Sequence, residues 1–443
     1  MILPKVEIVP VTQSDTKKER KKYFLQAISS AMSFCFPKNE KIDEKTNWLP
    51  MYGIPSKKGN GEYNEPPIYD KYHIDYLSDY FSDDENCAVL TMIVEQEYFS
   101  PTFFNDYKNF YSSIFTRHDR TCSRIHFLGC EFSNADLREF LNIGQNDSLS
   151  LSILQDKYLG FLVLRPLPEQ IIGPTLLKLY PKESKDGKYL RTFHAAREYS
   201  VNLFGINIPV NSLIFTSQDK IVGACASYAL WMAFHKTSEL FKTQLPTPSE
   251  ITRKAGKSTK THHKTFPNKG LDAIQIGTAI ESIGLEPEYR APEKGVLQLY
   301  YHKIDRKFFN LAQRKRNYEA EASKFDANNW LTVLDIISVK AYIYAYSKAG
   351  IPVLLGIRFS DSDLHLIAIS GYKELSAISP LPNDTAHSES LSLTSNRITN
   401  FYCHDDNVGA FSRLSFCDDI AKIGSEGYDY GKLITGWSNP KNE

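Results

Sequence analysis

The sequence has no excess of charge of either sign, because 52 Lys and Arg residues balance 52 Asp and Glu residues over 443 positions. It therefore lacks the global field that draws a protein to nucleic acid or to anionic lipid. No uninterrupted apolar stretch approaches the ~20 residues that span a bilayer. Residues 1–7 lack the basic, apolar and small-residue order of a signal peptide. We expect no nucleic-acid partner, no membrane partner and a cytoplasmic location.

Cysteine is sparse, with seven residues, an odd number, and none of them lies in a Cys-x-x-Cys pair. Unpaired cysteines are the norm in a reducing compartment, which supports the cytoplasmic location. The sequence also has no His-Glu-x-x-His helix, no Gly-rich phosphate loop and no Gly-x-Ser-x-Gly motif, and His262-His263 lacks further ligands at metal spacing. We expect neither a cofactor nor a metal ion.

What is present is a globular composition, 42% hydrophobic and 13% aromatic, in a chain too long for one ordinary core. Short apolar runs predict buried strands at 87–95, 123–128 and 158–164, with a helix at 101–115. The polar segment 38–85 is interrupted by Gly and Pro, so we expect it to be largely loop.

We expect two domains, an α+β unit over 1–190 and a second unit over 191–443. The first unit shows no obvious catalytic group in its sequence. In the second unit, helices are expected to precede strands. The expected helices are 225–240, 270–285 and 335–349, and the expected strands are 353–358, 364–371 and 400–404.

Cys225 follows a turn-prone run, 218–224, and opens a segment that fits only a helix. A thiol at a helix N-terminus faces the positive end of the helix dipole, which favours the thiolate. The structural alternative is a small buried hydrophobe, the commonest fate of a cysteine. The residues downstream favour the functional interpretation.

His365 lies in a strand-like apolar run, 364–369, and Asp405 ends another, 401–405. A nucleophile, a base and an orienting acid in this order are typical of a cysteine hydrolase. His365 would take the thiol proton and return it to the leaving group, although it could instead be a satisfied core histidine. Because side chains alternate along a strand, Asp405 and Asp406 should not both face His365.

Several strings together resemble the papain-like cysteine peptidases, and most closely the bacterial double-glycine-leader (bacteriocin-processing) group. The likeness covers 218–416, roughly half of the chain. The strings that carry it are Gln218 ahead of Cys225, the Gly270-Leu271 to Gly284-Leu285 helix, Ala349-Gly350-Ile351-Pro352-Val353 before His365 to Gly371-Tyr372, and His404-Asp405-Asp406 before Gly409.

The resemblance implies an α+β fold in which a helix bearing the cysteine packs on an antiparallel sheet bearing the histidine and the aspartate. It assigns 191–443 to the papain-like domain, preceded by the N-terminal α+β domain, and selects Asp405 as the acid. Gln218 would join the Cys225 backbone N–H in stabilising an oxyanion, although a plain exposed loop residue explains Gln218 equally well.

The resemblance further implies a cysteine peptidase that cleaves a peptide or isopeptide bond of a protein or peptide substrate through an acyl-enzyme. The N-terminal domain would contribute recognition of the substrate or of a protein partner. By analogy alone, the absence of a transporter segment suggests a conditional protease in bacterial, anti-phage defence. The alternatives are a transglutaminase-like acyl transferase with the same triad, and a catalytically inactive papain-fold binding module.

Overall fold

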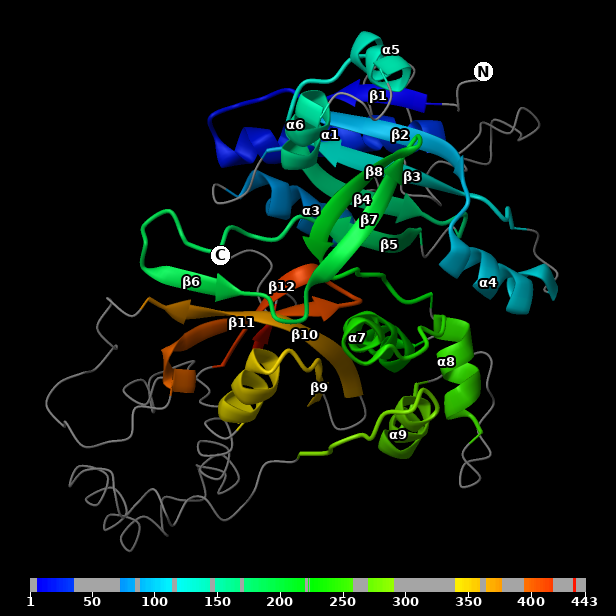
Figure 1. Cartoon of the computed structure of the whole chain (residues 1–443), viewed down its shortest axis with the longest axis vertical. Coiled ribbons are helices and arrows are strands. Elements are labelled where there is room, and N and C mark those ends of the chain that lie inside the picture. The colour runs from blue at the N-terminus through cyan, green and yellow to red at the C-terminus, as the bar shows by residue number, and fades with distance from the viewer. Residues whose placement is uncertain are drawn as a thin grey trace, which may run out of the picture.

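A computed structural model of the chain describes twelve stretches of residues and the single residue Val222. The stretches are 6–35, 72–83, 88–113, 118–143, 148–167, 171–219, 224–257, 270–290, 339–358, 364–376, 394–416 and 433–435, with 222 between two of them. Within this part of the chain the architecture is α+β with antiparallel sheets, as the sequence predicts (Figure 1).

The first sheet has five antiparallel strands in the order β1-β2-β3-β4-β5. They are β1 (Val6–Pro10), β2 (Thr91–Tyr98), β3 (Cys122–Leu128), β4 (Tyr158–Leu164) and β5 (Ile172–Leu177). Every residue of β3 and β4 is buried, which explains why both appear in the sequence as apolar runs without alternation. The strand expected at 87–95 begins later, at Thr91, and runs to Tyr98.

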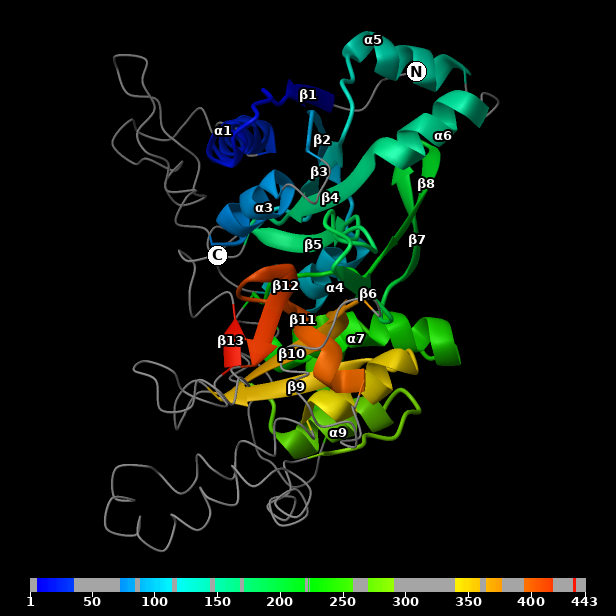
Figure 2. The same cartoon turned by 90° about the vertical axis from the view of Figure 1, so that its left-hand side faces the viewer.

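Both faces of this sheet are covered (Figure 2). Helices α1 (Lys17–Cys35) and α3 (Tyr72–Ser82) pack on one face, and the hairpin of β7 (Arg197–Leu203) and β8 (Ile206–Ser212) packs on the other. The hairpin shows the alternating burial of strands with one solvent-facing side.

Helix α3 lies within the segment 38–85 that is expected to be largely loop: residues 72–82 are helical, and 38–71 lie outside the described residues. Ile74, Leu77 and Phe81 are spaced to share one face of a helix, and all three are buried. The polar flanks concealed this short amphipathic helix in the sequence.

The second sheet runs β13-β12-β11-β10-β6, with β9 also paired to β10. Its strands are β6 (Tyr189–Thr192), β9 (Val353–Arg358), β10 (Leu364–Leu375), β11 (Ile398–Asp405), β12 (Gly409–Phe416) and β13 (Leu433–Thr435). The strands expected at 353–358, 364–371 and 400–404 are therefore confirmed, and β10 continues four residues beyond its expected end at 371. Strand β6 spans the boundary placed at residue 190, so the proposed division into two domains falls within a strand.

Helix α7 (Cys225–Phe241) packs against β10 and is confirmed over its expected length. It is buried on nearly every side, as expected of a helix at the centre of a protein. A second helix, 339–348, contributes Ile343 to the cluster that contains Ile367 and Ile369 of β10. It lies within the expected helix 335–349, of which 335–338 are outside the described residues.

The remaining helices frame these layers. They are α4 (Pro101–Asn109), η2 (Tyr111–Ser113), α5 (Asn134–Ile143), α6 (Ser148–Lys157), α8 (Pro248–Ala255), α9 (Ala273–Glu281) and η5 (Thr394–Arg397). Among the helices of the described residues, none has both the length and the apolar character needed to cross a membrane. His262-His263 lie outside the described part of the chain.

Candidate active site

Cys225 is the first residue of α7 and is half-buried. Its predecessor Ala224 has an extended backbone and supplies no side-chain cap. The first backbone N–H groups of a helix have no partner within the helix, so they present partial positive charge at this end. The thiol therefore occupies the position that the sequence predicts for a nucleophile.

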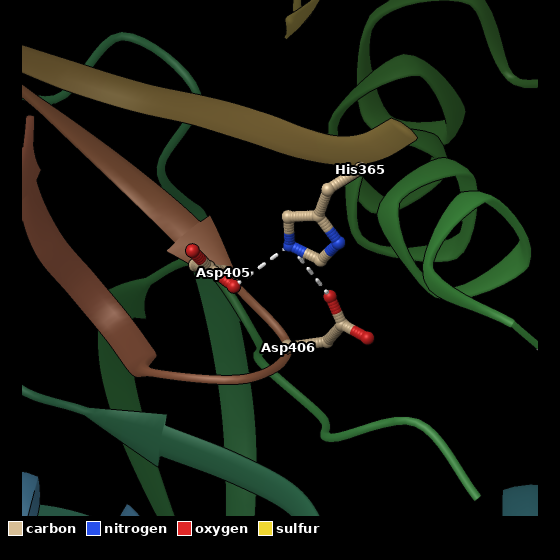
Figure 3. A group of neighbouring side chains, drawn as sticks. All are labelled: His365, Asp405 and Asp406. Carbon is tan, nitrogen blue, oxygen red and sulfur yellow. Dashed lines mark hydrogen bonds and ion pairs between the residues drawn. The ribbon is translucent and has the colours of Figure 1, made fainter. Parts of the chain in front are cut away.

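His365 stands near the start of β10, and Asp405 is the last residue of β11, its antiparallel neighbour. The His365 Nε2 lies 2.9 Å from Asp405 Oδ1, and both side chains are buried (Figure 3). The same carboxylate oxygen accepts a hydrogen bond from the Asn407 backbone N–H at 3.0 Å. The two sequence-predicted residues are thus brought into direct contact.

Asp406 also contacts His365, because its Oδ1 lies 3.3 Å from the same Nε2 atom (Figure 3). The expectation that only one of the two aspartates faces the imidazole is therefore wrong. Alternation of side chains holds only within a strand, and β11 ends at Asp405, where the chain turns into β12. Sequence reasoning missed Asp406, and the turn that starts there is the signal that could have identified it.

The environment of His365 favours the charged imidazolium. Burial acts to lower its pKa, but the hydrogen bonds with Asp405 and with the Cys225 thiol, and the charges of Asp405 and Asp406, outweigh burial and raise the pKa to about 10. With Nε2 directed at the two carboxylates, Nδ1 is the ring atom left for Cys225. The imidazole is thus placed between an acid pair and a thiol.

Gln218 lies beside this acid turn, where its Nε2 donates to Asn407 Oδ1 at 3.2 Å. Asn407, which sequence reasoning also missed, therefore contacts both the sequence-predicted acid and the sequence-predicted oxyanion residue. An amide nitrogen has two hydrogens, so the bond to Asn407 leaves one of them for another acceptor.

Helix α3 of the first half supports the same turn from outside. His73 Nε2 donates to the Asp406 carbonyl oxygen at 2.8 Å, and the Tyr76 hydroxyl donates to the Ala410 carbonyl oxygen at 2.6 Å. These bonds fix the backbone on which both aspartates stand. The two partners in each of these bonds lie more than 300 positions apart, so no local pattern in the sequence predicts them.

A second histidine, a tryptophan and three further cysteines have structural roles. His404 is buried edge-on against Phe411, with ring centroids 4.7 Å apart, and burial lowers its pKa to about 3. Trp231 is buried in α7. Among the described cysteines, burial raises the pKa of Cys35 and of Cys122 to about 12 and also raises that of Cys130. None of these three is prepared as a nucleophile.

His365, Asp405 and Asp406 could also hold a divalent cation, since one ligand atom from each lies within 4.8 Å of the others. Such an ion would replace the proton that the imidazole shares with the carboxylates. The contact of the imidazole with Cys225 favours acid–base chemistry instead, because a thiol beside a charged histidine completes a nucleophilic site.

The chain matches no protein-family model, no curated protein and no solved structure. The resemblance to papain-like peptidases therefore rests on the sequence strings given above and stays a prediction.

Proposed function

We propose that the chain is a cysteine hydrolase with a papain-like arrangement of Cys225, His365 and Asp405, and that it cleaves peptide or isopeptide bonds. The observation that carries the proposal is the buried imidazole of His365, which is bonded to Asp405 through Nε2 and whose pKa is raised in part by the Cys225 thiol at the start of α7. An antiparallel sheet that bears the base and the acid, packed against a helix that bears the thiol, supports the papain-like arrangement.

In the proposed reaction, the Cys225 thiolate attacks the substrate carbonyl carbon, and the developing oxyanion is met by helix N–H groups and by Gln218. The imidazolium of His365 gives its proton to the leaving amine, so the C–N bond breaks and a thioester remains. The imidazole, now neutral, takes a proton from water, which attacks the thioester and releases the acid and the free thiolate. Asp405 and Asp406 hold the ring and stabilise its charged form.

The first test is the reactivity of the thiols in the full chain. We expect iodoacetamide to label Cys225 at least about tenfold faster than Cys130 at neutral pH, because Cys225, unlike Cys130, adjoins a charged imidazole. His365→Ala should remove this advantage, and Cys130 serves as the control within the same molecule. Site-resolved mass spectrometry provides the measurement, and equal rates for the two thiols would contradict the proposal.

The second test separates the chemistry at the acyl-enzyme. Acylation of Cys225 by p-nitrophenyl acetate should release a burst of p-nitrophenolate that Cys225→Ala lacks. Turnover in the presence of methylamine then distinguishes hydrolysis from acyl transfer, since a transferase would form the amide. A burst unchanged by a chelator excludes a required metal ion, and loss of the burst on chelation would favour the cation site.

A protease role in the cell requires its own observation. Comparing new protein termini in cells that express the wild type or Cys225→Ala would identify peptide substrates. New termini that appear with the wild type and not with Cys225→Ala would support peptide cleavage. A defence role would further require that this cleavage appears on phage infection.

A further inference from the structure

The loop that precedes Cys225 is held by side chains of the first half of the chain. Asp219, six residues before Cys225, is 3% exposed, and its two carboxylate oxygens have separate partners. Oδ1 accepts from the Val222 backbone N–H at 2.9 Å, and Oδ2 accepts from the Tyr111 hydroxyl at 2.6 Å. One side chain thus joins the Val222 backbone to η2.

The residues on either side of Asp219 are anchored as well. Arg165, which directly follows β4, donates through Nη2 to Ser217 Oγ at 3.1 Å. Thr252 of α8 donates to the Val222 carbonyl oxygen at 3.0 Å. The loop is therefore attached to the first sheet at its start and to α8 near its end, with Asp219 between them.

This loop carries the groups that the proposed reaction needs at the oxyanion. Gln218 is adjacent to Asp219, and the loop ends at the backbone N–H of Cys225. A donor that stabilises an oxyanion is effective only when held in place before the reaction, and a displacement of about 1 Å can cost about a hundredfold in rate. The conformation that Asp219 fixes is therefore a direct determinant of the rate of carbonyl attack.

We propose that Asp219 is a positioning residue that holds the loop before Cys225, and that Tyr111, from the first half of the chain, holds the Asp219 side chain in place. The inference rests on the proposed function, because it assigns Asp219 and Tyr111 to the same reaction. It gives the first half a part in the chemistry, although none of its side chains reacts. A buried carboxylate is costly to retain unless it is hydrogen-bonded, and the bonds from Val222 and Tyr111 contribute to that requirement.

The test compares two chemically identical substitutions, Tyr111→Phe and Tyr80→Phe, in the full chain. Both hydroxyls belong to tyrosines that are 3% exposed, and each donates one bond, to Asp219 and to the Lys178 carbonyl oxygen respectively. Both variants lose one buried hydrogen bond, and Tyr111→Phe should lose more stability because its partner is a carboxylate. Only the first loosens the loop.

Two probes separate positioning from general damage. In acylation by p-nitrophenyl acetate, the S–C bond forms, the C–O bond breaks and p-nitrophenolate leaves with the electron pair, so the step passes through an oxyanion. Alkylation by iodoacetamide displaces iodide and forms no oxyanion. We expect Tyr111→Phe to slow acylation about fivefold or more while alkylation stays within about twofold, and Tyr80→Phe to change neither.

Asp219 itself provides a rescue test. Asp219→Ala removes both bonds and should slow acylation more than Tyr111→Phe does. Asp219→Asn keeps an oxygen for the Val222 N–H and gains an amide group that can donate to the Tyr111 hydroxyl oxygen, so it should recover most of the lost rate. Thermal unfolding of each variant shows whether the protein remains folded at the assay temperature.

The outcomes distinguish the two levels of inference. For wild-type Cys225, the ratio of the acylation rate to the alkylation rate can be compared with the same ratio for an ordinary thiol. If the two ratios are equal, the proposed function fails and this inference fails with it. If the wild type reacts rapidly but Tyr111→Phe and Tyr80→Phe behave alike, the function stands and the positioning role is overturned. If Asp219→Ala leaves the ratio of the acylation rate to the alkylation rate unchanged, the positioning role is also overturned.

Discussion

At the scale of single residues, the decisive feature is an imidazole nitrogen shared by two carboxylates. Asp405 and Asp406 contact the same Nε2 atom of His365, at 2.9 and 3.3 Å. Each charge favours the imidazolium, so the second carboxylate adds to the effect of the first. The proton of His365 is therefore held over a wider range of pH than one acid would allow.

This arrangement predicts a pH-dependent contribution of Asp406 to stability. The pKa of His365 is raised from 6.5 to about 10, against burial, by its bonds with Asp405 and Cys225 and by the charges of both aspartates, so its contribution is complete below pH 6.5 and is lost as pH rises towards 10. Asp406→Asn should lower this pKa, and the variant should be less stable than wild type near pH 6. The deficit, about 1.4 kcal/mol for each unit of pKa lost, should shrink towards pH 10.

Urea unfolding at a series of pH values measures the deficit. In a His365→Gln background the imidazole is absent, so the pH dependence of the Asp406→Asn effect should vanish. A deficit that stays constant from pH 6 to pH 10 would show that Asp406 acts through packing and not through the charge of His365.

Cys225, His365 and Asp405 could be predicted from the sequence as members of one site because each lies at or near the end of a strongly patterned helix or strand. The sequence was insufficient for Asp406 and Asn407, whose side-chain directions depend on where β11 ends. It was also insufficient for Tyr111 and Asp219, because nothing local marks two polar residues 108 positions apart as partners.

At the scale of elements, α3 sets the position of the turn between β11 and β12. Gly409 opens β12, opposite Asp405 in the ladder, and the ring of Tyr76 lies directly against it. A Cβ atom on Gly409 would lie 2.2 Å from Tyr76 Cδ1, closer than any real contact. Only glycine allows α3 to approach the turn that carries the two aspartates.

We therefore expect Gly409→Ala to displace either the ring or the turn, at a cost of about 1–3 kcal/mol. Gly356→Ala in β9 is the matched control, because a Cβ there meets nothing within 4 Å. In a Tyr76→Ala background the part of the Gly409→Ala cost that comes from the ring should disappear, and the part that comes from the backbone at φ +158° should remain, so a double-mutant cycle of unfolding free energies would detect a coupling between the two positions. Additive costs would show that Tyr76 is not the obstacle.

At the scale of the whole molecule, the two sheets share one hydrophobic core. A single cluster of buried residues contains Phe24 of α1, Phe127 of β3, Trp231 of α7 and Phe411 of β12. Tyr180, which follows β5, stacks on Tyr402 of β11, with ring centroids 5.5 Å apart. The strands and helices of both halves were largely predictable from local patterns, whereas this continuity was not, because it arises from contacts between segments distant in the sequence.

The continuous core predicts how the chain unfolds. A boundary at residue 190 would cut β6, remove the partners of Trp231 and Phe411, and expose their apolar surface to water. We expect the full chain to unfold in one transition, with circular dichroism and tryptophan fluorescence coinciding in urea. Residues 191–443 expressed alone should lack cooperative unfolding, and coexpression with residues 1–190 should restore it. Two separate transitions, or a fragment 191–443 that unfolds cooperatively and retains rapid acylation of Cys225, would show instead that the second half is an independent catalytic domain.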